Sequence, residues 1–75
     1  MNAKYTLNAR RLLCPLPVIR TQEMVKKLKT GDILEVISTD SGVLQDIPAW
    51  CRINGHKVLD SFNDEYDYFI LLEVG

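Results

Sequence analysis

Cys14-Pro15-Leu16-Pro17 marks where the first helix of this chain begins. Proline is favoured in the first turn of a helix, because its missing N–H would have no intrahelical partner there. The motif therefore predicts a helix starting at Pro15, with Cys14 at or beside the N-cap. The free N–H groups and the positive end of the helix dipole favour an anion at this place. We expect Cys14 to have a lowered pKa and to react as a thiolate.

Two interpretations of Cys14 follow from the residues alone. A free cysteine is most often a small buried apolar residue, and that is the structural alternative here. Arg10 and Arg11 lie directly upstream, where their positive charge would reinforce the dipole, and a loop before a helix is commonly accessible. We therefore favour a reactive Cys14 in a turn that Pro15 and Pro17 stiffen.

The rest of the chain alternates between strand and helix signals. Branched or alternating apolar residues predict strands at 4–8, 33–38, 57–62 and 66–74, and helical patterns cover 15–29 and roughly 41–54. The order βαβαββ predicts an α+β fold, a two-layer sandwich with both helices on one face of a four-stranded mixed sheet. This follows because crossovers between parallel strands are right-handed, while the last two strands form a hairpin. The strand at 33–38 is expected to be central.

One side of the first predicted helix is expected to face the core, and it carries Val18, Gln22, Val25 and Leu28. Leu16 and Ile19 project away from this stripe. Either they are exposed beside Cys14 as part of a docking surface, or the helix buries a wider face that includes both of them. The sequence does not decide between these alternatives. The lysines before Gly31 would suit the negative end of the helix dipole.

The second predicted helix contains Pro48, which interrupts the pattern unless Asp46 caps a new helical turn in which proline is tolerated. Cys51 lies on the apolar face of this segment, so we interpret it as a buried, inert thiol rather than a resolving cysteine. Trp50 could mark a partner surface, but it shares the face of Cys51 and is therefore expected in the core.

Other polar residues have plain structural interpretations. Asp40 and Asp46 are most simply helix caps, since aspartate is favoured at N-caps. His56 follows Asn54-Gly55 and has no identifiable partner in the sequence, so we interpret it as a surface or turn residue.

Length and composition limit what this chain can do. Its 75 residues, 47% of them hydrophobic, predict a single domain over 1–75. A domain of this size buries only about 60–65% of the surface that its unfolded chain exposes. Little room remains for an enclosed active site. No segment has the layout of a membrane helix or a secretory signal, so a cytoplasmic location is expected. One histidine and two cysteines are too few for structural zinc, and no metal is expected.

The net charge of −1 hides an asymmetry. The residues before Gly31 include seven basic side chains against Glu23 alone, whereas the remainder holds nine acids against Arg52 and Lys57. Such clusters are usually ordinary solvated faces. The functional alternative is a basic rim beside Cys14, formed by Arg10, Arg11 and Arg20, that steers an acidic partner protein.

Cys14-Pro15-Leu16-Pro17 after a short strand, with Asp46-Ile47-Pro48-Ala49-Trp50-Cys51 downstream, resembles the TusA/SirA family of sulfur carriers over nearly the whole chain. The CPxP motif of that family matches at Cys14, Pro15 and Pro17, with Leu16 at the variable position. The resemblance implies that Cys14 carries a covalent persulfide, with no separate cofactor.

The resemblance also implies partners, namely a cysteine desulfurase or another persulfide donor and a downstream acceptor protein. The pathways it implies are tRNA thiolation, molybdenum cofactor synthesis and sulfur oxidation. Direct nucleic-acid binding is not expected, because no aromatic residue interleaves the basic ones. The alternative function is a small RNA- or protein-binding module in which Cys14 is incidental. Thiol–disulfide redox chemistry is disfavoured because the motif lacks the second cysteine of CxxC.

Overall fold

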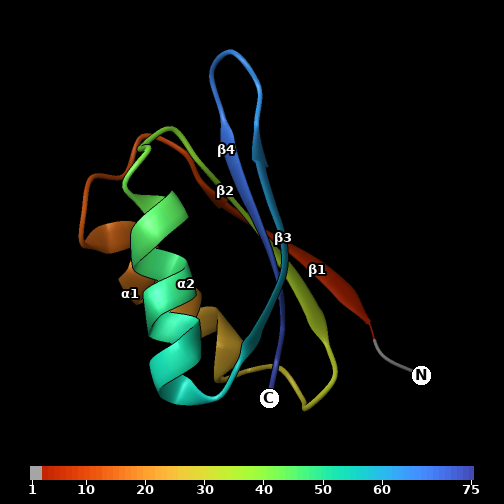
Figure 1. Cartoon of the computed structure of the whole chain (residues 1–75). Helices are drawn as coiled ribbons and strands as arrows, with labels where there is room; N and C mark the ends of the chain where they lie inside the picture. The colour runs from red at the N-terminus through yellow and green to blue at the C-terminus, as the bar shows by residue number, and fades with distance from the viewer. Residues whose placement is uncertain (1–2) are drawn as a thin grey trace.

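The computed structural model describes residues 3–75, and these form four strands and two helices. The elements in chain order are β1 (Lys4–Ala9), α1 (Leu16–Val25), β2 (Ile33–Ser38), α2 (Val43–Asn54), β3 (Lys57–Asn63) and β4 (Tyr68–Glu73) (Figure 1). The predicted order βαβαββ is confirmed. The third element, β2, has the predicted bounds, and β4 is shorter than the predicted strand at both ends.

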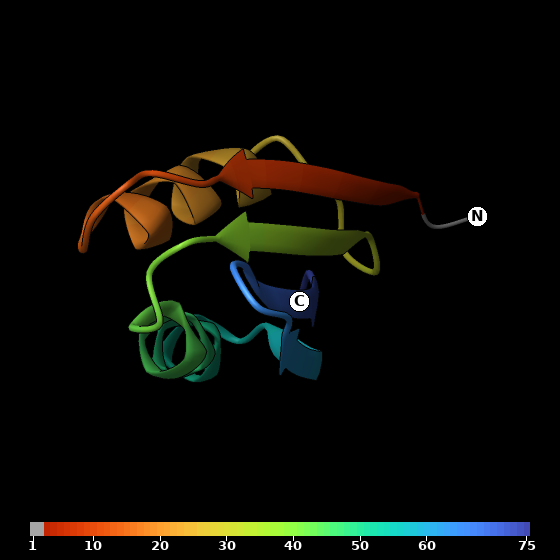
Figure 2. The same cartoon turned by 90° about the horizontal axis from the view of Figure 1, so that it is seen from above.

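The sheet has the strand order β1-β2-β4-β3, which Figure 2 shows from above. The pair β1 and β2 is parallel, whereas β4 runs antiparallel to both of its neighbours. The two crossovers, from β1 to β2 and from β2 to β3, therefore move in the same direction across the sheet. Right-handed crossovers that move in one direction place their helices on one face. Both helices accordingly lie on the same side of the sheet (Figure 1).

The core lies between this helix-covered face and the two helices. Strand pairing aligns Leu7 with Val36 and Val36 with Ile70, so one row of apolar side chains crosses three strands. Leu34, Val36, Ile70 and Leu72 are all fully buried. Helix α2 contributes Val43, Ile47 and Cys51, which are four residues apart and therefore lie on one face. The predicted central position of β2 is confirmed.

Helix α1 is shorter than predicted, and its buried face is shifted from the predicted stripe. Val25 is buried and Val18 and Leu28 pack against the core, as predicted. It ends at Val25, and the following residues form turns instead of the predicted helix to Lys29. Its buried residues are Pro17, Thr21 and Val25, whereas Gln22, which we placed in the core stripe, is exposed. The hydroxyl of Thr21 donates to the Pro17 carbonyl at 2.8 Å, so burying this polar group leaves no unmet hydrogen bond.

The early end of α1 also removes the predicted basic last turn. Lys26 is the C-cap, and Lys27 and Lys29 lie beyond the helix. Gly31 then adopts a φ of 92°, and its N–H donates to the Val74 carbonyl at 2.8 Å. This left-handed conformation favours glycine and returns the chain to the sheet.

Helix α2 is continuous from Val43 to Asn54 with Pro48 inside it, so Asp46 does not cap a new turn. Gly42 is the N-cap, and no side chain caps this end. Proline has no N–H to donate to the carbonyl of Leu44, four residues earlier. At the other end Gly55 has a φ of 80°, which is the left-handed helix stop expected of Asn54-Gly55.

The opposite face of the sheet is not covered by either helix. The residues on it include Ile37, Phe69 and Phe62, which occupy neighbouring positions on β2, β4 and β3. The rings of Phe62 and Phe69 stack with centroids 4.7 Å apart, and Phe62 remains 46% exposed. Within residues 3–75, neither helix has the length and apolar character needed to cross a bilayer.

Asp32 ties the loop after α1 to the start of β1, and we predict that Asp32→Asn destabilises the fold at neutral pH. Its carboxylate accepts from the N–H of Lys29 at 2.8 Å and of Ala3 at 3.2 Å, and these bonds lower the pKa of Asp32. A lowered folded-state pKa gives stability that is present above the unfolded pKa of about 4 and is lost as the pH falls through the folded value.

Thermal unfolding between pH 2 and pH 7 tests this prediction. Wild type should lose more stability than Asp32→Asn as the pH falls, so that the two melting temperatures converge at low pH. Asp60→Asn, on the exposed strand β3, is the matched control and should follow wild type. Parallel curves for wild type and Asp32→Asn would show that the carboxylate charge contributes nothing.

Candidate functional site

Cys14 lies in the loop between β1 and α1, at the carboxyl end of the parallel pair β1 and β2. The N-cap of α1 is Pro15, so the helix begins at Leu16 and Cys14 lies one residue before the cap, as the motif predicts to within a residue. The side chain of Cys14 is exposed. Carboxyl ends of parallel strands are where loops of an open sheet meet and where binding sites collect.

The loop that follows β2 holds the Cys14 loop in place. The N–H of Arg11 donates to the Thr39 hydroxyl at 2.9 Å, and the N–H of Cys14 donates to the Asp40 carboxylate at 3.2 Å. Arg11 has a φ of 66°, an uncommon left-handed conformation for a non-glycine residue, at the turn that redirects the chain toward Cys14. The two loops lie side by side at this end of the sheet (Figure 1).

Two carboxylates face Cys14. The Cys14 thiol donates to an Asp46 carboxylate oxygen, Oδ2, with a sulfur–oxygen distance of 3.3 Å. Asp40 uses Oδ2 for the Cys14 N–H and Oδ1 for the N–H of Gly42, at 3.0 Å. Both aspartates were interpreted as helix caps. Gly42 is the N-cap of α2 and has no side chain to make a capping bond, although Asp40 Oδ1 accepts from the N–H of Gly42 just before the helix. Both aspartates also accept from Cys14.

These carboxylates reverse the expected effect on the thiol. The hydrogen bond to Asp46 is the main cause that raises the pKa of Cys14 above its ordinary value, followed by desolvation and by the negative charges of Asp46 and Asp40. We expected a lowered pKa from the helix dipole and from Arg10 and Arg11. That expectation is wrong, since the charged groups acting on the sulfur are acidic and lie about thirty residues away in the chain.

The arginines of the predicted basic rim have separate roles in the structure. Arg10 forms a salt bridge with Asp67, the residue directly before β4, at 2.9 Å. This contact raises the pKa of Arg10 and joins the end of β1 to the hairpin. Arg20 pairs with Glu23 one turn along α1, at 3.4 Å. Ion pairs this exposed to water are weak, so both guanidinium groups can be recruited by another molecule.

Several apolar side chains close to Cys14 in the sequence are exposed. Leu16 is 41% exposed and Ile19 is 43% exposed, which decides the question left open by the helix pattern in favour of exposure. Leu13 is 74% exposed and was not singled out from the sequence. We define the apolar rim as Leu13, Leu16 and Ile19. Exposed apolar residues gathered in one place are typical of protein-interaction surfaces.

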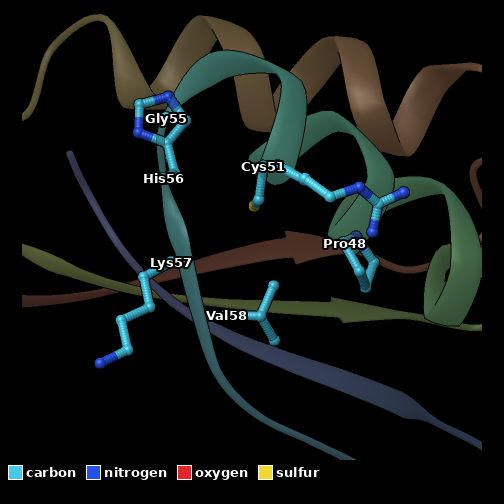
Figure 3. A pocket seen from close by; sticks show the side chains of 7 residues that line it. Pro48, Cys51, Gly55, His56, Lys57 and Val58 are labelled. Atoms are coloured by element: carbon cyan, nitrogen blue, oxygen red, sulfur yellow. The ribbon is translucent and has the colours of Figure 1, made fainter.

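Cys51 is the buried counterpart of Cys14. Its side chain is fully buried in the core, and burial raises its pKa to about 11. The predicted assignment of Cys51 to the core is confirmed. An open cavity of about 520 Å³ lies beside it between α2 and β3 (Figure 3). The cavity is lined by Pro48, Cys51, Arg52, Gly55, His56, Lys57 and Val58, and Cys14 is not among these residues.

His56 has partners that the sequence did not reveal. Its ring stacks on Trp50 with centroids 4.9 Å apart, and its Nδ1 accepts from the N–H of Gly75 at 2.9 Å. His56 and Trp50 are each half-buried, and Trp50 packs against the core as predicted. We therefore assign His56 a structural role rather than the free turn position predicted for it. Among residues 3–75, no three histidine, cysteine or acidic side chains gather as a metal site would require.

Comparison with known proteins places this chain among sulfur-handling proteins. The family model described as "Sulfurtransferase TusA" matches residues 5–74. The chain is 40% identical over 67 residues to Bacillus subtilis YrkI, provisionally named a sulfur carrier protein, covering 89% of this chain and 88% of YrkI. It is 34% identical over 73 residues to a Neisseria meningitidis protein with the same provisional name, covering 97% of each.

Two further comparisons concern a longer protein and a solved structure. The chain is 41% identical over 59 residues to Bacillus subtilis YrkF, also provisionally named a sulfur carrier protein, but it covers only 32% of YrkF. The crystal structure of a SirA-like protein from Desulfitobacterium hafniense superposes with a TM-score of 0.83 at 20% identity, covering 95% of this chain and 97% of that one. The structural likeness concerns the fold.

We predict that a thiol reagent labels Cys14 and spares Cys51 in the folded protein. At pH 8 a thiol with a pKa of about 11 is ionised to about one part in a thousand, and its burial adds steric protection. Intact-mass analysis after brief exposure to iodoacetamide should show one adduct, absent from Cys14→Ser. Unfolding in guanidinium should add the second adduct. Labelling of native Cys51 as fast as that of Cys14 would contradict the assignment.

Proposed function

This chain belongs to the TusA family of sulfurtransferases, and we propose that it is a sulfur carrier that holds sulfur as a persulfide on Cys14. The observation that carries the proposal is the contrast between the two thiols, because Cys14 is exposed whereas Cys51 is fully buried. One accessible sulfur is sufficient for a carrier. It is held on a loop anchored by Thr39 and Asp40, so its position is defined before a partner arrives.

The transfer follows the chemistry of thiol–disulfide exchange. Cys14 attacks the terminal sulfur of a donor persulfide, forming a new S–S bond as the bond inside the donor breaks. The donor leaves as a thiolate and takes up one proton, while the Cys14 thiol has lost one. In the second step a thiolate of the acceptor attacks the terminal sulfur, and Cys14 is the leaving group. No external oxidant or reductant is needed for either step.

The partners of such a carrier are a persulfide donor, such as a cysteine desulfurase, and a protein that accepts the sulfur. The apolar rim of Leu13, Leu16 and Ile19 offers a contact surface at the thiol, and Arg11 and Arg20 add positive charge on the same stretch of chain. A persulfide must be shielded from bulk thiols during transfer. A docked partner that covers the apolar rim would provide that protection.

Persulfide formation on one cysteine is the direct test. After incubation with a cysteine desulfurase and cysteine, we expect the intact mass to rise by that of one sulfur atom and to return to its original value with dithiothreitol. Cys14→Ser should show no gain, and Cys51→Ala should keep it. A gain that persists in Cys14→Ser, or no gain with any persulfide donor, would contradict the proposal.

We further predict that Leu16→Glu and Ile19→Asp slow transfer from a protein donor without unfolding the carrier. Both side chains are exposed, and surface substitutions usually change stability by about 0.5 kcal/mol or less. Ile53→Asp is the matched control, because Ile53 is 80% exposed on α2 and lies outside the apolar rim. Single-turnover persulfide transfer should fall about tenfold in the rim variants and stay unchanged in the control. A sharp drop in melting temperature would instead place the two residues in the core.

A further inference from the structure

The contact between Cys14 and the two aspartates is built into the fold. Asp40 is fixed on three sides, because its own N–H donates to the Ser38 hydroxyl at 3.0 Å while its carboxylate accepts from Gly42 and from Cys14. Asp46 lies on the first turns of α2 and accepts from the Cys14 thiol itself. Asp40 and Asp46 are both half-buried residues. The acids are therefore positioned by the backbone around Cys14.

The Cys14 sulfur is subject to two opposing electrostatic effects. Helices α1 and α2 both begin at this end of the sheet, since each follows a strand of the parallel pair, and helix N-termini favour an anion. The carboxylates of Asp46, from α2, and of Asp40, from the loop after β2, oppose an anion. These two acids are the charged side chains that act on the Cys14 thiol from the elements packed against it. Removing their charge would leave the helix dipoles as the main influence.

Within residues 3–75, neither Asp40 nor Asp46 takes part in a salt bridge. The salt bridges found there join Arg10 to Asp67 and Arg20 to Glu23. The carboxylates at the thiol are thus free to pair with a cation supplied from outside. Such a pair would withdraw the acceptor from the thiol and neutralise the charge that disfavours the thiolate.

We propose that Asp40 and Asp46 form a gate that keeps Cys14 protonated until a docked protein places an arginine or lysine side chain against them. This proposal rests on the proposed carrier function and names the chemistry of the partner, a cationic contact beside the apolar rim. It also makes Asp46 a positioning residue for the sulfur transfer. Cys14 of the free carrier would then react more slowly with alkylating reagents and disulfides than a fully ionised thiol, while the docked carrier presents a thiolate.

A partner cation pairs with Asp46, the Cys14 thiol loses its proton to solvent, and the resulting thiolate attacks the terminal sulfur of the donor. The donor S–S bond breaks, its electron pair leaves on the donor sulfur, and that sulfur takes a proton from solvent. The sulfane sulfur changes partner, and the number of thiols and persulfides is the same before and after.

Alkylation kinetics test the gate without any sulfur transfer. The rate of Cys14 labelling by iodoacetamide, followed by intact mass from pH 6 to pH 10, gives the pKa of the thiol. Asp46→Asn should lower that pKa, Asp40→Asn should lower it less, and Asp60→Asn, a matched charge change on β3, should leave it unchanged. Each unit of decrease raises the thiolate fraction at pH 7 about tenfold. Unchanged or higher values in Asp46→Asn would overturn the proposal.

A cationic probe tests the second half of the gate. A tetra-arginine peptide at constant ionic strength should speed labelling of wild-type Cys14 at pH 7 several-fold, whereas tetra-glutamate should not. The acceleration should be largely absent in Asp46→Asn and retained in Asp60→Asn. Equal acceleration in wild type and Asp46→Asn, or acceleration by tetra-glutamate, would overturn the gate. The carrier function is judged separately by the mass gain from a persulfide donor, so either idea can fail alone.

Discussion

The parallel pairing of β1 with β2 is the constraint on which the site depends. It aligns Ala9, the last residue of β1, with Ser38, the last residue of β2, so both chains leave the sheet at the same edge. The loop carrying Cys14 and the loop carrying Asp40 then have to run beside each other. Two hydrogen bonds between these loops, from Arg11 to Thr39 and from Cys14 to Asp40, fix their relative position. Helix α2 starts from the same edge and brings Asp46 to the sulfur.

Because the same edge also gathers both helix N-termini, the chemistry of Cys14 is set by a balance rather than by one effect. The dipoles stabilise a thiolate, whereas the two carboxylates stabilise the thiol. In the free protein the hydrogen bond to Asp46 acts directly on the sulfur and is the main cause that raises the pKa of Cys14. A balance of this kind is sensitive to small changes in charge, which is the property that partner-dependent activation requires.

Much of the fold was predictable, because strand and helix periods and turn residues are local signals. The order of elements and the bounds of β2 follow from them. The buried face of α1 was not fully predictable, because it includes Thr21, whose hydroxyl donates to the Pro17 carbonyl and can therefore be buried without an unmet hydrogen bond. Cys14 was predictable as an accessible thiol, but its electrostatics were not. Sequence neighbours suggested arginines, whereas strand pairing supplies aspartates from distant positions. Parallel strands ending at Ala9 and Ser38 were the signal that could have revealed Asp40.

The proposed carrier function asks little of this small domain, because substrate selection would be made by the proteins with which it docks. The small core is filled by residues such as Leu34, Ile47 and Ile70, and Cys14 lies exposed outside it. A thiol on an open surface would react with any electrophile that reached it if it were permanently ionised. Holding that thiol protonated with fixed acids moves selectivity to the docking step. The same openness that makes the site simple to build therefore makes control by neighbouring charges necessary.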